Sequence, residues 1–123
     1  MSELLGVVVC HGSLGQALVA SAEEITGVRG VLAAVSNSGC DRGVLEARIS
    51  DAVGGRPAVV FVDMPSGSCH FAAAHRLAAS QDIRIVTGVN LAMLVDFVFH
   101  RNLSPAAAAE RARDTGTRAM VIR

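Results

Sequence analysis

Aromatic and disulfide-forming residues are scarce in this sequence. Among its 123 residues it has no Trp, no Tyr and only four Phe. It therefore lacks the aromatic platforms on which single-stranded nucleic acids stack. The three cysteines, Cys10, Cys40 and Cys69, are odd in number and lack C-x-x-C spacing. This argues against a disulfide framework and favours a reducing, cytoplasmic compartment.

Excess charge and long apolar runs are also missing. Eleven basic residues balance eleven acidic ones, so no overall field attracts nucleic acid or an anionic membrane surface. Asp63 and Asp96 interrupt the most apolar stretches, which excludes a run long enough to span a bilayer. The first ten residues contain Glu3 and no Lys or Arg, unlike a secretory signal. We expect a soluble protein that binds no nucleic acid.

Hydrophobic residues make up 51% of the chain and charged residues only 18%. This composition and length predict a single domain over residues 1–123 with a buried core. Apolar runs of strand length alternate with segments of helical period, which predicts a three-layer α/β/α fold with a mainly parallel sheet. The predicted strands are 4–10, 30–36, 57–63, 83–88 and 118–123, and the predicted helices are 14–27, 43–54, 68–80, 90–101 and 104–116.

In a parallel sheet, ligands bind beyond the carboxyl ends of the strands. Polar loops follow three of the predicted strands: "CHGS", "DMPSGS" and "TGVN". His11 ends the first strand, and Gly12 and Ser13 lead into a helix whose free N–H groups favour an anion. A phosphoryl group on the imidazole suits this place.

Asp63 ends the third strand, and its carboxylate is able to hold one ring nitrogen of His11 if the two strands are neighbours. Gly67 then provides a flexible turn, and Ser68 is expected to cap the next helix and contact a phosphate. Each residue also has an ordinary alternative: a histidine at a strand end is often structural, and Asp and Ser are common in turns and caps.

Three segments, "GVVVCHGSLGQALVASAEEITG", "VVFVDMPSGSCHFAAAHRLA" and "IRIVTGVNLAMLVDFVF", cover most of the chain. Their order and spacing resemble the IIA domain of the mannose/fructose class of the bacterial phosphoenolpyruvate-dependent sugar phosphotransferase system. The resemblance implies that His11 accepts a phosphoryl group from the histidine phosphocarrier protein and passes it to a IIB domain in sugar uptake. It also implies that Asp63 orients His11 and that Ser68 contacts the phosphate.

The resemblance further implies a sheet of strand order 2-1-3-4. The closing strand 118–123 is then antiparallel at an edge, and is exchanged across a homodimer in some members of the family. No cofactor is expected, and contact with a membrane is expected only through a transporter complex. The chain departs from the family pattern around the site, at Cys10, Ser66, Cys69, His70 and Phe71.

These departures leave two alternatives open. Cys10, His11, Cys69 and His70 form two Cys-His pairs that would be the ligands of a zinc-binding variant, although neighbours on a strand point to opposite faces. The other alternative is a regulatory module, in which phosphorylated His11 signals to another protein and has no role in transport.

Overall fold

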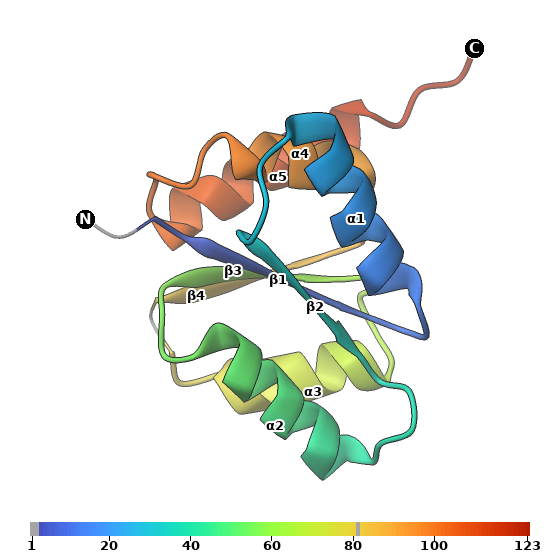
Figure 1. Cartoon of the computed structure of the whole chain (residues 1–123), viewed down its shortest axis with the longest axis vertical. Helices are drawn as coiled ribbons and strands as arrows, with labels where there is room; N and C mark the ends of the chain where they lie inside the picture. Colours follow the sequence, from blue (N-terminus) through green and yellow to red (C-terminus); the bar gives the residue numbers. More distant parts are fainter. Residues whose placement is uncertain (1–2, 81) are drawn as a thin grey trace.

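Strands and helices alternate along the chain up to the fourth helix, which is followed by a further helix, and they form three layers in the computed structural model (Figure 1). The structure describes residues 3–80 and 82–123. The strands are β1 (Leu5–Cys10), β2 (Leu32–Ser36), β3 (Ala58–Val62) and β4 (Ile83–Thr87). The helices are α1 (Leu14–Thr26), α2 (Arg42–Val53), α3 (Ser68–Leu77), α4 (Leu91–Val98) and α5 (Pro105–Arg118).

The sheet is parallel and has the order β2-β1-β3-β4, which confirms the expected topology. The two central strands, β1 and β3, are buried along their whole length. Continuous apolar sequence is typical of such strands, because helices cover both faces of a parallel sheet.

The two faces of the sheet carry separate hydrophobic cores. Helices α1, α4 and α5 cover one face, and α2 and α3 cover the other (Figure 1). Alternating residues of each strand enter the two cores, so that Val8 faces the first and Val7 and Val9 face the second. In the first core the rings of Phe61 and Phe97 pack edge to face, with centroids 5.2 Å apart.

Helix ends follow local chemistry that the sequence displays. Gly27 and Gly54 adopt left-handed conformations just after α1 and α2. Asn90 and Ser104 accept hydrogen bonds from backbone N–H groups in the first turns of α4 and α5, and Pro105 is the first residue of α5. Within residues 3–80 and 82–123, no helix combines the length and apolar character needed to cross a membrane.

The closing strand expected over 118–123 is not formed within the single chain. Arg118 is still helical, as the last residue of α5, and the exposed tail after it has no strand structure (Figure 1). A strand needs a neighbouring edge to pair with, and the described part of the chain gives this tail none. The expected antiparallel edge is therefore missing, and β4 is the last strand on its side of the sheet.

Candidate functional site

The order of strands reverses between β1 and β3. From β1 the chain continues outward to β2 on one side, and from β3 it continues to β4 on the other. Such a reversal leaves a crevice beyond the carboxyl ends of the two central strands. His11 follows β1 and Asp63 follows β3, so both side chains begin at the edge of this crevice.

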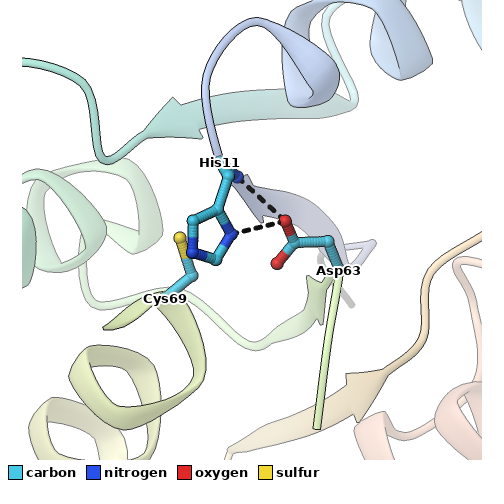
Figure 2. Close-up of side chains that lie close together, drawn as sticks. All are labelled: His11, Asp63 and Cys69. Carbon is cyan, nitrogen blue, oxygen red and sulfur yellow. Dashed lines mark hydrogen bonds and ion pairs between the residues drawn. The ribbon is translucent and has the colours of Figure 1, made fainter. Parts of the chain in front are cut away.

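His11 and Asp63 are joined twice. The backbone N–H of His11 donates a hydrogen bond to Asp63 Oδ2 at 2.9 Å, and the ring Nδ1 lies 2.7 Å from the same oxygen (Figure 2). The Asp63 side chain is only 9% exposed, whereas that of His11 is 42% exposed. The predicted pairing is therefore present, with the carboxylate buried and the imidazole open to solvent.

The charge of Asp63 fixes the proton on the ring. Burial alone raises the pKa of the Asp63 carboxyl. The hydrogen bonds from the His11 backbone and ring, together with the ring's charge, outweigh burial and lower this pKa overall. The carboxylate is consequently ionised at neutral pH and can only accept hydrogen bonds. Nδ1 must then carry the hydrogen, which leaves the lone pair of a neutral ring on Nε2.

Gly67 and Ser68 lie beside Nε2. The hydroxyl of Ser68 is 3.4 Å from Nε2, and a Cβ added at Gly67 would lie 3.8 Å from it. Gly67, with φ +91°, precedes α3 as its N-cap, and Ser68 is the first residue of the helix. The expectation that Ser68 caps α3 is therefore wrong, because its hydroxyl is directed to the imidazole.

Two helices begin at the site. Ser13 is the N-cap of α1 and Gly67 that of α3, and neither cap uses a side chain to bond the helix N–H groups. The first N–H groups of a helix have no partner within it and carry partial positive charge. Gly12, with φ +59°, makes the turn from His11 into α1. Gly12 and Ser13 therefore lie at the start of α1, and Gly67 and Ser68 lie at the start of α3 beside the ring.

Asn37, which no sequence motif indicated, connects the two loops. Its Oδ1 accepts a hydrogen bond from Gly12 N–H at 3.1 Å, and its Nδ2 lies 3.4 Å from Ser68 Oγ. The available signal was its position, because Asn37 directly follows β2, whose carboxyl end lies beside that of β1. Ligands bind beyond the carboxyl ends of parallel strands, and this applies to the loop after β2 as well as to the three polar loops named from the sequence.

The four-ligand set Cys10, His11, Cys69 and His70 is not brought together. Among the described residues, the group with metal-ligand spacing is His11, Asp63 and Cys69. Cys10 packs in the core on the opposite face of the sheet from Cys69, as the alternation of strand side chains demands. Burial and the charge of Asp63 raise the pKa of the Cys10 thiol to about 12 and that of Cys69 to about 11.

Known structures share this fold. Phosphotransferase system component EIIA from Streptococcus agalactiae is 18% identical, with a TM-score of 0.89, and the match covers 97% of this chain and 96% of that one. The mannose/sorbose specific IIA subunit from Enterococcus faecalis is 18% identical, with a TM-score of 0.85 and coverage of 99% and 96%. A sigma-54 interaction domain protein from Enterococcus faecalis is 12% identical, with a TM-score of 0.79 and coverage of 96% and 93%.

Sequence comparison gives the family directly. No curated protein matches the chain. Residues 6–113, however, match the family described as PTS system fructose IIA component, where PTS denotes the phosphotransferase system. The match includes β1 from its second residue, all of β3, and both His11 and Asp63. The chain therefore belongs to the fructose IIA component family of the phosphotransferase system.

Proposed function

We propose that His11 is the phosphoryl acceptor of this IIA protein. Membership of the family makes the chain a component of the phosphotransferase system. In the proposal, Nε2 of His11 takes a phosphoryl group from the histidine phosphocarrier protein and passes it to a IIB domain during sugar uptake. The observation that carries this is the 2.7 Å contact between Nδ1 and Asp63, which leaves Nε2 as the nucleophile on an exposed ring.

The reaction needs only a positioned nucleophile and donors for the phosphate oxygens. The phosphorus–nitrogen bond of the donor phosphohistidine breaks as a phosphorus–nitrogen bond to Nε2 forms, and the donor imidazole leaves with the electron pair. No proton is removed from His11, because Nε2 carries none. Since like bonds are exchanged, the step is close to thermoneutral and runs in either direction.

Each neighbour then has a role. Asp63 keeps the hydrogen on Nδ1 and offsets the positive charge that the ring gains on phosphorylation. The Ser68 hydroxyl, 3.4 Å from Nε2, is near enough to donate to a phosphate oxygen once the phosphoryl group is there. Gly12, Ser13 and Gly67 bring the backbone N–H groups of α1 and α3 toward the same oxygens.

A homodimer is part of the proposal. The outer edge of β4 and helix α5 line a cavity of about 370 Å³ formed by Arg84, Ile85, Val86, Thr87, Ala106, Ala109, Glu110 and Arg113. The exposed tail carries Met120, Val121 and Ile122. We propose that the tail of one subunit pairs with the β4 edge of the other, because this covers both an open edge and an apolar segment.

The remaining expectations follow from the same role. The chain acts as one domain over residues 1–123, works in the cytoplasm, reaches the membrane only through the transporter complex, and needs no cofactor. Its partners are the histidine phosphocarrier protein and a IIB domain.

The direct test is phosphorylation in a purified system. The protein is incubated with phosphoenolpyruvate, enzyme I and the histidine phosphocarrier protein, and the product is analysed for acid-labile phosphate by intact mass. One phosphoryl group per chain is expected. His11→Ala abolishes labelling, whereas His75→Ala, which removes an exposed histidine on α3, leaves it intact. Labelling of His11→Ala at the wild-type level refutes the proposal.

A regulatory role is the second candidate, because a sigma-54 interaction domain protein has the same fold. In that case phosphorylated His11 changes the binding of another protein and no IIB domain accepts the phosphoryl group. Adding a purified IIB domain to the phosphorylated protein separates the two. Loss of label from His11 supports transfer, and retention of label supports regulation.

A further inference from the structure

We propose that His11, Asp63 and Cys69 form a binding site for a thiophilic divalent cation of the zinc class, and that the bound cation blocks phosphorylation of His11. One ligand atom from each residue, an imidazole nitrogen, a carboxylate oxygen and a thiol sulfur, lies within 4.8 Å of the other two. In Figure 2 the three side chains converge from the ends of β1 and β3 and from the start of α3. The blocking of phosphorylation rests on the function proposed above, whereas the binding does not.

An unpartnered oxygen points to a missing ligand. Within residues 3–80 and 82–123, the buried Asp63 Oδ1 has no hydrogen-bond partner, whereas Oδ2 of the same carboxylate accepts two. Both oxygens face the His11 ring in Figure 2. Buried polar atoms without a partner are uncommon, because each loses its hydration without replacement. A cation beside Oδ1 supplies the missing interaction.

The sulfur of Cys69 has no part in the proposed transfer, yet it lies beside the imidazole in Figure 2. Cys69 is fully buried, and its neighbour Ser68 already contacts Nε2. A cation that binds the sulfur replaces the thiol proton, and its double charge neutralises both the thiolate formed and the Asp63 carboxylate. Binding then releases the thiol proton to solvent.

The donor set selects the class of cation. Thiolate and imidazole ligands favour zinc and similar soft or borderline ions, while magnesium and calcium prefer oxygen ligands alone. Zinc–ligand bonds of about 2.0–2.3 Å put neighbouring ligand atoms roughly 3.3–3.8 Å apart in a tetrahedral site. The three ligand atoms, which lie within 4.8 Å of one another, therefore need to move closer by about 1 Å to reach this spacing. Solvent supplies the fourth ligand.

Binding and phosphorylation exclude each other through the imidazole. A cation on Nε2 occupies the lone pair that attacks phosphorus, and a cation on Nδ1 displaces the hydrogen bond to Asp63. Because this coupling is reciprocal, a phosphoryl group on His11 lowers the affinity for the cation by the same factor by which the cation disfavours phosphorylation. The site would then make phosphoryl flow sensitive to free zinc.

The binding test uses tag-free, reduced, metal-free protein with Zn²⁺ alone in calorimetry and Co²⁺ alone in absorption spectroscopy. One ion per chain and a thiolate-to-cobalt charge-transfer band are expected. Cys69→Ala removes the band and, like His11→Ala, weakens zinc binding by more than about tenfold, a scale on which even outer-sphere partners act. Cys40→Ser is the matched control, because Cys40 lies outside the three-residue group and its thiol bonds the Asn37 carbonyl.

The outcomes separate cleanly. Zinc affinity of Cys69→Ala equal to that of wild type, or cobalt binding without the charge-transfer band, overturns the site. The blocking effect is measured as the ratio of phosphorylation rates with and without zinc, compared between wild type and Cys69→Ala in the same enzyme mixture. A fall in this ratio for wild type alone supports blocking, and equal ratios overturn it. Calorimetry and cobalt absorption decide the metal site even if His11 proves not to be phosphorylated.

Discussion

Val9 of β1 lies opposite Val62 of β3 in the parallel sheet. One residue after Val62 the chain reaches Asp63, and two residues after Val9 it reaches His11. The register of two buried apolar strands therefore brings the polar pair together at the crevice. A slip of one residue in either strand would turn the side chains of that strand to the wrong core, so the packing of the valines also protects the geometry of the site.

Replacing Asp63 by Asn should slow phosphorylation while leaving the fold intact. The amide can donate to Nδ1 and so stabilise the tautomer whose hydrogen is on Nε2, which removes the nucleophilic lone pair. We expect single-turnover rates to fall by roughly ten- to a hundredfold, as for other partners that orient a histidine. Asp114→Asn, at an exposed position on α5, is the control. A wild-type rate for Asp63→Asn removes Asp63 from the mechanism.

Replacing Gly67 by Ala tests the space beside Nε2. The new Cβ would lie 3.7 Å from Cε1 and 3.8 Å from Nε2 of His11, and the positive φ adds strain of about 1–3 kcal/mol. Gly30→Ala has comparable strain, with φ +80°, but no atom within 4 Å of the added Cβ. Denaturant unfolding should show that both variants are destabilised. Phosphorylation at His11 should be slowed only in Gly67→Ala. Equal phosphorylation rates in the two would contradict a role for the open space.

Replacing Asn37 by Ala should loosen the turn at Gly12. Its Oδ1 is the acceptor for Gly12 N–H at 3.1 Å, and a hydrogen bond of this kind contributes about 0.5–1.5 kcal/mol. As a positioning residue, Asn37 should affect kcat several-fold and leave the KM for the phosphocarrier protein unchanged. Asn37→Asp keeps the acceptor but puts a negative charge near the phosphate, and should be slower still. A change confined to KM would assign Asn37 to docking instead.

The folding free energy should respond to acid through Asp63. Its pKa in the folded chain lies below the ordinary value of 3.8, because the hydrogen bonds from His11 outweigh burial. Such a group stabilises the fold fully above its unfolded pKa and loses that effect as the pH falls through its folded pKa. In urea titrations, the free-energy difference between wild type and Asp63→Asn should stay level from pH 7 to about 5 and shrink below 3.8. A difference that grows on acidification contradicts this.

Removing residues 119–123 should abolish the proposed dimer. The tail exposes Met120, Val121 and Ile122, and it follows α5 without contributing a strand to its own sheet. Sedimentation equilibrium is expected to give a dimer for the full chain and a monomer for the truncated one, with the same circular dichroism. A monomeric full chain, or a truncated chain that still dimerises, rules out exchange of the tail.

Much of the fold was predictable because its signals are local. The apolar runs give the four strands of the sheet, and Gly27, Gly54, Asn90 and Ser104 terminate or begin helices as their backbone chemistry predicts. The tail is different, since "RAMVIR" has strand composition yet Arg118 remains helical. Whether such a segment becomes a strand depends on an edge outside it, which composition does not encode.

The site was predictable where it depends on strand ends. His11 and Asp63 follow from the rule that parallel strands bring their carboxyl ends together. The hydroxyl of Ser68 was expected to cap α3, because a serine at a helix start has two competing partners, the helix N–H groups as donors and the imidazole nitrogen as acceptor, and sequence does not rank them. Asn37 and the sulfur of Cys69 were not predicted as part of the site. Their side chains point to it only once β2 has paired with β1 and α3 has packed on the sheet.

The double attachment of His11 to a single carboxylate oxygen has a kinetic consequence. With its backbone and Nδ1 both held by Asp63, the ring offers one fixed approach to Nε2. Under the proposed function, the donor and acceptor proteins must then occupy the same footprint in turn, and each would act as a competitive inhibitor of the other. Throughput would consequently pass through a maximum as the concentration of either partner rises, so the proportion of the two in the cell sets the rate as much as their amounts.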